Sequence, residues 1–464
     1  MKIVEGLTFD DVLLVPIVSE VLSRKQVSTA THITEKIKLE MPIVSANMDT
    51  VTEAEMAITM AKVGGVGVIH RFNTIEAQAN EITKVKREQN VVIENPYYVT
   101  DEASLDELRK LSLEKGVSGF PVLNSEGKLV GIITKRDYSF EVDNTKKVKD
   151  LMTRDVITAE PGVSHESAKK LMAKNKIEKL PIINKNGKLV GMITAKDIRS
   201  LGISMDFSTK DKKGRLVVGG AIGVGGDYLE RTKALIDAET DFIVVDIANG
   251  YLDKTAEVVK DIKKRFGVEI IAGNVATKEG VLHLKKAGAD CIKIGIGPGG
   301  ACLTRPVAGV GYPQLSAIME CAGNGTRIIS DGGIVRSADL SKAMAAGADA
   351  VMIGSLLAGT DESPGSIVTK SNQNFKFYRG MASINAFSDK ALRTNEEIDI
   401  ESYTPEGTEM LIPYKGSASK ILHNLVGGLK SAMTYLNAKD LKDFRNNASF
   451  VRLTEAGKKE SKYI

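Results

Sequence analysis

The sequence predicts an α/β protein: a (β/α)8 barrel with a second, smaller unit inserted into it. Two observations carry this prediction. Eight short apolar runs end in Gly, Asp, Asn or His and mostly alternate with helical patterns, and an internal repeat interrupts them after the second run. Apolar strands that alternate with helices are typical of a parallel sheet covered by helices, and eight such units close into a barrel. A doubly wound open sheet is the alternative.

The eight predicted barrel strands are residues 42–49, 66–70, 215–221, 242–250, 268–274, 291–299, 327–333 and 350–359. Helical patterns lie between most of them, for example residues 254–266, 278–288 and 337–347. Active sites of such barrels form at the carboxyl ends of the strands. The residues that end these runs are therefore the candidate functional residues.

The interruption is a tandem repeat. Residues 119–137 (GFPVLNSEGKLVGIITKRD) match residues 179–197 (KLPIINKNGKLVGMITAKD) at a constant offset. Each copy has the pattern strand, Asn/Gly turn, strand and capped helix, and two such units can bury their apolar faces against each other. We therefore divide the chain into residues 1–92 with barrel strands one and two, 93–200 with the repeat pair, and 201–464 with the remainder of the barrel.

Composition excludes several classes of protein. The net charge of +4, from 63 basic and 59 acidic residues, is too balanced to favour nucleic-acid binding. No apolar run approaches the ~20 residues of a membrane span, and the first residues lack the apolar core of a signal peptide. Three cysteines in so long a chain make no disulfide framework, so we expect a cytoplasmic protein without a membrane partner.

The loop of residues 294–305 (IGIGPGGACLTR) is the most informative stretch. Four glycines precede Cys302, and such a loop brings backbone amides and carbonyls close to a ligand or ion. Cys291 begins a strand and Cys321 lies in a helical run, so Cys302 is the best candidate nucleophile of the three. On spacing alone, a small structural thiol at Cys302 is an equally good interpretation.

Strands seven and eight end in glycine-rich turns. In (β/α)8 barrels these two loops commonly bind phosphate through backbone N–H groups, a role that suits Gly332, Gly333, Gly354 and Ser355. Asp331 can accept hydrogen bonds from ribose hydroxyls. After the barrel, residues 375–383 offer polar contacts, and the polar residues 388–407 form either a surface loop or a functional one.

These motifs, in their order along the chain, resemble the inosine-5'-monophosphate dehydrogenase / GMP reductase family. The matching stretches cover nearly the whole chain: residues 6–16, 47–57, 272–277, 295–305, 331–333, 354–365, 378–381 and 405–407. The repeat pair resembles two CBS modules, which in many proteins bind adenine or guanine nucleotides. The resemblance implies ATP or GTP as possible ligands of residues 93–200.

The resemblance also implies residue roles. Cys302 would attack C2 of the purine, hydride would pass between C2 and a nicotinamide cofactor, and Thr304 with Glu406 would handle protons. The implied substrate-binding residues are Ala46, Asp331, Gly332, Gly333, Gly354, Ser355, Tyr378, Gly380, Met381 and Glu406. The implied cofactor-binding residues are Asp246, Asn274, Gly295 and Gly297.

A monovalent cation and self-association are further implications of the resemblance. The backbone carbonyls of Gly297, Gly299 and Cys302 match a K⁺ site, and a cation there needs the oxygen ligands that such a loop can present. Glu460 and Ser461 match residues that complete the cation site of a neighbouring subunit. A homotetramer or an octamer is therefore expected.

The residues leave two directions of the reaction open, oxidation of IMP and reduction of GMP. We expect an IMP dehydrogenase that oxidises IMP to XMP with NAD⁺ in guanine nucleotide biosynthesis, with Arg393 activating water. Family dehydrogenases have Tyr after this Arg, whereas this chain has Thr394, and Gly300 stands where the family usually has a phosphate-binding Ser.

GMP reductase, which would use NADPH to convert GMP to IMP and ammonia, is the alternative. Residues 246–251, 309–322 and 328–333, together with Ala382, favour it. A catalytically inactive nucleotide sensor is a more remote alternative, against which the intact set of Cys302, Thr304 and Glu406 argues.

Overall fold

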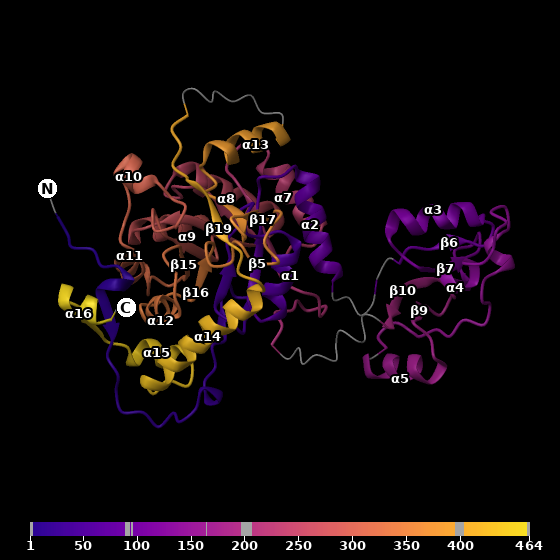
Figure 1. Ribbon diagram of the computed structural model, residues 1–464, viewed down its shortest axis with the longest axis horizontal. Helices are drawn as coiled ribbons and strands as arrows, with labels where there is room; N and C mark the ends of the chain where they lie inside the picture. The colour runs from indigo at the N-terminus through magenta and orange to yellow at the C-terminus, as the bar shows by residue number, and fades with distance from the viewer. Residues whose placement is uncertain are drawn as a thin grey trace. The chain divides into compact units, whose positions relative to one another are not determined.

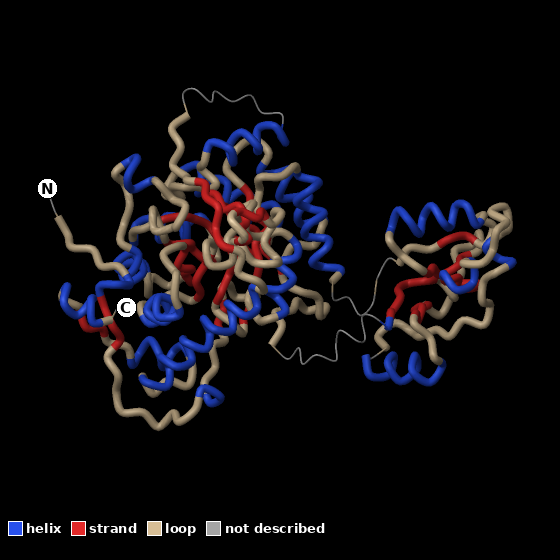
Figure 2. Tube along the Cα trace, in the orientation of Figure 1, coloured by secondary structure: helices blue, strands red, loops and turns tan. Residues whose placement is uncertain are grey.

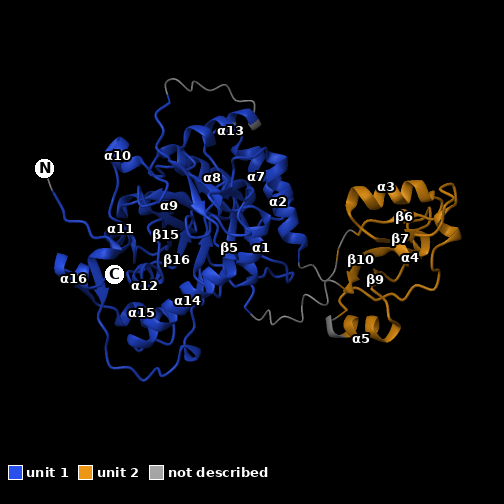
Figure 3. Ribbon diagram, viewed as in Figure 1, with its two compact units in different colours: residues 1–88, 206–464 blue, residues 89–205 orange. Residues whose placement is uncertain are grey.

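A computed structural model describes residues 3–88, 93, 96–163, 165–195, 207–394 and 403–461. The chain forms two compact units (Figure 3), which we describe separately. One unit comprises Met1–Glu88 and Asp206–Ile464, and the other comprises Gln89–Met205. No helix in the described ranges is both long and apolar enough to cross a membrane.

The larger unit contains a closed barrel of eight parallel strands, which confirms the predicted fold and rules out the open sheet. Around the barrel the strands are β11 (Val218–Ile222), β12 (Phe242–Asp246), β13 (Glu269–Val275), β14 (Cys291–Ile294), β15 (Arg327–Asp331), β16 (Ala350–Ile353), β4 (Ile43–Ser45) and β5 (Val66–Ile69). Each strand lies within or overlaps one of the eight predicted runs. Several strands end earlier than the predicted runs. In β14 the reason is the glycines that follow: Gly295 has a φ of +150° and Gly297 a φ of +86°, so the strand ends at Ile294.

Helices cover the outside of the barrel (Figure 1). They are α1 (Ala54–Lys62), α2 (Ile75–Arg87), α7 (Tyr228–Asp237), α8 (Asp253–Phe266), α9 (Lys278–Ala287), α11 (Gln314–Cys321) and α12 (Ser337–Ala345). The short α10 (Thr304–Ala308) belongs to the loop after β14 and buries none of its residues. In α8 the apolar Val258, Val259 and Ile262 are buried, three basic residues lie in the last turn, and Gly267 ends the helix with a φ of +61°. An apolar stripe, a basic carboxyl end and a left-handed glycine are the features that specify such a helix.

Further elements surround the barrel (Figure 2). A three-stranded antiparallel sheet consists of β17 (Val368–Lys370), β18 (Gln373–Arg379) and β19 (Glu409–Pro413), and α13 (Ile384–Thr394) lies between its last two strands in sequence. The chain continues through α14 (Ala418–Tyr435), α15 (Leu441–Asn447), β20 (Phe450–Arg452) and α16 (Glu455–Glu460). Near the amino terminus, β1 (Val12–Leu14) pairs with β20, and β2 (Thr31–His32) pairs with β3 (Lys38–Leu39).

The β2–β3 hairpin closes one end of the barrel. It leads directly into β4, so it lies at the amino end of that strand. Its Ile33 and Leu39 are completely buried and belong to the same apolar cluster as the barrel residues Val68, Val244 and Met352. The loops that form the site lie at the opposite end of the barrel, at the carboxyl ends of the strands.

The smaller unit has the predicted repeat. One copy contains β6 (Val99–Thr100), α3 (Leu105–Lys115), β7 (Gly119–Leu123), β8 (Leu129–Thr134) and α4 (Lys135–Tyr138), and the other contains α5 (His165–Asn175), β9 (Lys179–Ile183) and β10 (Leu189–Thr194). In both copies the two strands joined by the turn are antiparallel (β7 with β8, and β9 with β10), whereas β6 pairs with β7 in parallel. The turn glycines Gly127 and Gly187 have the same φ of +74°. The capped helix predicted after β10 lies outside the described residues.

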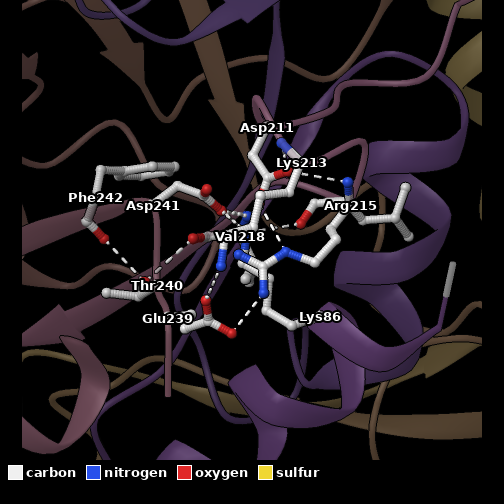
Figure 4. Close-up of polar contacts among 10 residues, drawn as sticks. Lys86, Asp211, Lys213, Arg215, Val218, Glu239, Thr240, Asp241 and Phe242 are labelled. Carbon is white, nitrogen blue, oxygen red and sulfur yellow. Dashed lines mark hydrogen bonds and ion pairs between the residues drawn. The ribbon is translucent and has the colours of Figure 1, made fainter. Parts of the chain in front are cut away.

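A buried ion-pair network lies between the end of α2 and the segment that leads into β11 (Figure 4). The ammonium of Lys86, a residue only 3% exposed, lies 2.5 Å from Asp241 Oδ2, 3.2 Å from Asp211 Oδ2 and 3.1 Å from the Leu216 carbonyl oxygen. Arg215 binds the same carboxylate of Asp211, with its Nε 3.0 Å from Oδ2. Burial raises the pKa of Asp241 even with Lys86 beside it, so this carboxylate depends on the ammonium.

Substituting Lys86 with methionine is expected to lower the free energy of unfolding by about 3–5 kcal/mol, because it leaves the largely buried Asp241 carboxylate without its cation. Lys213→Met is the matched control. Lys213 belongs to the same network but pairs with Glu239 at an exposed site, so its loss should cost no more than about 0.5–1 kcal/mol. Denaturant unfolding of both variants measures the difference, and equal losses would contradict this account.

Candidate active site

A cavity of about 380 Å³ opens where the loops after the barrel strands meet the segments around β18 and β19. Seven of the predicted site residues line it: Gly299, Cys302, Thr304, Tyr378, Gly380, Met381 and Glu406. Met48, from the loop after β4, and Tyr403 line it as well. Residues that are distant in the sequence therefore share one concave surface, as a small-molecule site requires.

Cys302 is the cysteine that reaches this cavity. Its thiol donates a hydrogen bond to the hydroxyl of Thr304, with Sγ 3.3 Å from Oγ1, and its amide donates to the Gly299 carbonyl at 3.0 Å. Cys291 and Cys321 are fully buried, and burial raises the pKa of the Cys321 thiol to about 12 and that of Cys291 well above its ordinary value. Both therefore stay as inert thiols, whereas Cys302 is half-buried.

The segment that carries Glu406 is bound to the Cys302 loop by its backbone. Leu303 N donates to the Glu406 carbonyl at 2.7 Å, and Thr408 N donates to the Ala301 carbonyl at 3.0 Å. At Gly407, a Cβ atom would lie 2.7 Å from Ser383 N, so only glycine allows this approach. The fold thus brings Glu406 beside Cys302 and Thr304, although the two stretches are about a hundred residues apart.

A buried lysine that the sequence analysis missed binds two carboxylates at the ends of barrel strands. Lys293 in β14 is 2% exposed, and its ammonium binds Asp246 at the end of β12 and Asp331 at the end of β15, the latter at 2.9 Å. Asn274 Nδ2 donates to Asp331 Oδ2 at 3.0 Å and to the Gly295 carbonyl at 2.9 Å. Asn47 Nδ2 donates to Asp246 Oδ2 at 2.9 Å. One cation and two amides therefore fix both carboxylates.

The charges in this cluster support one another. Burial alone would raise the pKa of Asp246, but the Lys293 ammonium and the Asn47 amide hold it below its ordinary value. Burial likewise opposes the charge on Lys293, and the two carboxylates raise its pKa above its ordinary value. Lys293 stands in the otherwise apolar run CIKIG, and a charge in the middle of a predicted core strand is the sequence signal that could have identified it.

The loops after β14, β15 and β16 converge on the predicted phosphate site. Gly332 and Gly333 have φ values of +89° and +81°, and a Cβ atom at Gly332 would lie 3.1 Å from Gly299 N. A Cβ atom at Gly300 would lie 3.7 Å from the Ser355 hydroxyl. The cysteine loop thus contacts both glycine-rich turns, and the Lys415 ammonium, from the turn after β19, lies 2.5 Å from the Ser355 carbonyl oxygen.

Other predicted residues lie under or beyond the cavity. Ala46 is buried at the end of β4, and its Cβ lies 3.5 Å from where a side chain at Gly354 would begin. Arg393 belongs to α13, but its side chain and residues 395–402 lie outside the described part of the chain. Glu460 and Ser461 end α16, where Lys458 binds Asp11 at 2.7 Å, and they do not line the cavity.

Comparisons with known proteins find relatives along nearly the whole chain. The sequence model of the family described as the IMP dehydrogenase / GMP reductase domain matches residues 6–463. The inosine-5'-monophosphate dehydrogenase of Nitrosopumilus maritimus is 48% identical, covering 99% of this chain and 98% of that protein. The Bacillus subtilis enzyme of the same name is 47% identical, covering 98% and 95%.

Among solved structures, a variant of GMP reductase from Trypanosoma brucei in complex with guanosine 5'-monophosphate superposes with a TM-score of 0.91. It is 41% identical, and the match covers 99% of this chain and 98% of that one. Relatives named as the dehydrogenase and a relative named as the reductase therefore both match nearly the whole chain.

Proposed function

The chain belongs to the IMP dehydrogenase / GMP reductase family, and from this premise we propose that it is an IMP dehydrogenase, an NAD-dependent oxidoreductase that converts IMP to XMP in guanine nucleotide biosynthesis. The observation that carries the proposal is the half-buried Cys302 thiol, hydrogen-bonded to Thr304 in a cavity that Glu406 also lines. Full-length relatives named as this dehydrogenase, at 44–48% identity, support it.

The loops supply a nucleotide site from phosphate to purine. Backbone amides at Gly333 and Gly354, with the Ser355 hydroxyl, are suited to bind the 5'-phosphate. Asp331, held by Lys293 and Asn274, presents its carboxylate to the ribose hydroxyls. Tyr378, Gly380 and Met381, with Gly332 and Ala46 behind them, would hold the purine over the Cys302 thiol.

The chemistry follows from this placement. As the Cys302 sulfur bonds to C2 of IMP, the thiol gives up its proton to the protein or solvent and the C2=N3 electron pair moves to N3. C2 then loses its hydrogen as hydride and the C2=N3 bond re-forms, which leaves a thioimidate on the enzyme. When bound, NAD⁺ is the two-electron acceptor for that hydride. Water then adds to C2, the C–S bond breaks, XMP leaves, and the proton lost by the water passes to the protein, for which Thr304, Glu406 and Arg393 are the assigned residues.

The nicotinamide end of the cofactor requires polar groups close to C2. The assigned residues lie at or near the carboxyl ends of the three strands β12 to β14: Asp246, Asn274, Gly295 and Gly297. The side-chain oxygen of Asn274 is buried and has no hydrogen-bond partner among the described residues. An acceptor without a donor in such a position fits the carboxamide N–H of a nicotinamide.

A monovalent cation also fits the cysteine loop. Within the described residues, the carbonyls of Gly297 and Cys302 receive no backbone hydrogen bond, and the Gly299 carbonyl receives one, from Cys302 N. Carbonyl oxygens in a turn with Gly297 at a φ of +86° can face a common centre. We assign K⁺ to these three carbonyls, with Glu460 and Ser461 of a neighbouring subunit completing the site in a homotetramer.

GMP reductase is the second candidate. Thr394 follows Arg393, where a dehydrogenase of this family is expected to have tyrosine, and the solved structure with a TM-score of 0.91 is a GMP reductase. The two functions are separated by following nicotinamide absorbance in the purified chain with IMP and NAD⁺, and then with GMP and NADPH. We expect activity in the first assay, and activity in the second assay alone would overturn the proposal.

A serine at position 300 is expected to strengthen nucleotide binding. Gly300 does not have a positive φ, and a Cβ there makes only ordinary contact with Ser355, so Gly300→Ser is tolerated and adds a hydroxyl donor beside the phosphate. The KM for the nucleotide should fall roughly 3- to 10-fold, as expected for one additional hydrogen bond with a net contribution of about 0.7–1.4 kcal/mol. Gly300→Ala, which lacks the hydroxyl, is the control, and equal KM values for the two variants would contradict the assignment of the phosphate site.

The proposal also includes a nucleotide-binding role for the inserted repeat pair and a cytoplasmic location. We assign the repeat pair to CBS modules that bind ATP or GTP, because both copies have the same strand–turn–strand structure with a left-handed glycine. Occupancy of these modules would favour an octamer over a tetramer. All three cysteines are unpaired, which supports the reducing cytoplasm as the compartment.

A further inference from the structure

Arg379 stands between two residues that line the cavity, Tyr378 and Gly380, yet its own side chain is bound elsewhere. It is 6% exposed, and one edge of its guanidinium faces Asp49 in the loop after β4. The Nε atom lies 3.1 Å from Asp49 Oδ2, and Nη2 lies 2.5 Å from the same oxygen. This geometry uses the planar fork that distinguishes arginine from lysine.

The remaining nitrogen of Arg379 reaches a third element. Its Nη1 lies 2.7 Å from Oδ2 of Asp389 on α13. In the β18–β19 register Arg379 is also opposite Glu409, whose carboxylate accepts a hydrogen bond from the Asn385 amide, in the first turn of α13, at 3.1 Å. We call Asp49, Arg379, Asp389 and Glu409 the Arg379 junction.

The Arg379 guanidinium stays positively charged at the centre of the junction. Burial would disfavour the guanidinium, but Asp49 and Asp389 raise the pKa of Arg379 above its ordinary value. Burial also opposes the charge on Glu409, whose pKa is nevertheless lowered by hydrogen bonds from Ser383 and Asn385 and by the charge of Arg379. One permanent cation therefore holds acidic groups from the β4 loop, α13 and β19 together.

The junction is connected to the cavity by two short contacts. The Asp49 amide points at the sulfur of Met381, 3.3 Å away, and Met381 lines the cavity. The Arg379 amide donates to the Thr50 hydroxyl at 3.3 Å. A ligand that fixes the position of Met381 would therefore also restrict Asp49. Because Asp49 binds the Arg379 guanidinium, and Arg379 binds Asp389, the restriction would extend to α13. The last turn of α13 carries Arg393.

We propose that Arg379 is a positioning residue that couples nucleotide binding in the cavity to the order of α13, through its ion pair with Asp389. The inference rests on the proposed function only in that a purine nucleotide occupies the cavity. It adds a role for Asp389, a side chain that is 42% exposed and touches neither the cavity nor Cys302. Since α13 leads to Arg393, the coupling would make local opening of α13, and with it displacement of Arg393, rarer when substrate is bound.

The test uses hydrogen exchange of the α13 amides in the full chain, with and without saturating IMP or GMP. In the wild type we expect nucleotide to slow exchange in α13 by roughly 5-fold or more, a typical coupling between sites. In Asp389→Asn we expect nucleotide affinity to stay within about twofold, while the slowing in α13 is lost. Turnover should fall by roughly 5-fold at unchanged KM for the nucleotide.

Two further variants separate coupling from simple loss of structure. Asp389→Glu keeps the charge and should restore most of the nucleotide-dependent slowing. Ser388→Ala, the neighbouring position on the same helix, should behave as the wild type. Asp389→Asn is expected to fold, because the pair is partly exposed and such pairs contribute little to stability.

Each result of the hydrogen-exchange measurement either supports or overturns the coupling. Nucleotide-dependent slowing in Asp389→Asn equal to that of the wild type would overturn the coupling, as would its absence in the wild type while nucleotide binds. If neither IMP nor GMP binds the wild-type chain, the proposed function fails together with the coupling. Binding of GMP alone with slowing of α13 would support the coupling and contradict the proposed dehydrogenase.

Discussion

Replacing Cys302 with alanine is expected to reduce turnover on the order of 10⁴-fold or more, because the reaction then has no nucleophile to activate C2. Cys302 is half-buried at the wall of a cavity and packs in no apolar cluster, so the substitution should leave the fold intact. Nucleotide affinity should change only a few-fold, since the phosphate and ribose contacts are made by other loops. Steady-state rates and calorimetric titration with IMP and GMP measure the two effects separately.

Cys321→Ala is the matched control for this prediction. Cys321 is a free thiol in the same unit, completely buried in α11 with a pKa of about 12. Its removal leaves a small cavity and costs some stability, but the rate per folded molecule should stay within about twofold of the wild type. A Cys302→Ala variant that keeps a substantial part of the wild-type rate would exclude Cys302 as the nucleophile, and with it the mechanism proposed above.

The second large effect is expected at Lys293. Lys293→Met removes the cation between Asp246 and Asp331 and leaves two partly buried carboxylates facing each other, at an expected cost of about 3–5 kcal/mol in the free energy of unfolding. Nucleotide affinity should fall as well, because the Asp331 carboxylate loses the partner that orients it towards the ribose. Denaturant unfolding and titration with IMP test both effects.

This loss should depend on pH in a defined direction. In the wild type the pKa of Asp246 is below its unfolded value, so its ionised form stabilises the fold above that unfolded value, and the stabilisation is lost as pH falls through the folded value. Without the ammonium, burial raises the pKa of Asp246 instead. The difference in stability between wild type and Lys293→Met should therefore be largest near neutral pH and shrink towards about pH 4.

Lys376→Met is the control for burial of a lysine as such. Lys376 is 4% exposed, but its ammonium binds carbonyl oxygens, 2.7 Å from that of Ser363 and 3.3 Å from that of Asp361. Its removal should cost about 1–3 kcal/mol with little change between pH 4 and 7, because no buried carboxylate loses its partner. A Lys293→Met variant as stable as the wild type, or one with a loss independent of pH, would contradict the role assigned to the cluster.

Local patterns in the sequence were sufficient for the barrel and the repeat. Buried parallel strands are apolar runs of three to seven residues, and each of the eight can be recognised without knowing its neighbours. The ends were harder to predict. Residues 242–250 and 350–359 were read as strands, whereas β12 ends at Asp246 and β16 at Ile353, because hydrophobicity continues into loops that turn over the barrel mouth.

The site was only partly predictable, for a physical reason. Cys302 was visible because its own loop is distinctive, but spacing alone left it as an equal choice between nucleophile and structural thiol. Lys293 was missed because its meaning depends on Asp246 and Asp331, which come from two other strands. Arg379 was seen only as a polar contact, because Asp49, Asp389 and Glu409 meet it through tertiary pairing.

The most direct test of the account follows IMP and NAD⁺ through a single turnover on the full chain, with acid quenching and mass analysis of the peptide that contains Cys302. The account predicts that NADH forms together with a nucleotide adduct on that peptide, and that the adduct decays as XMP appears. NADH formation without an adduct would contradict the covalent role of Cys302. No NADH from IMP, with NADPH consumed when GMP is supplied, would contradict the assignment as a dehydrogenase.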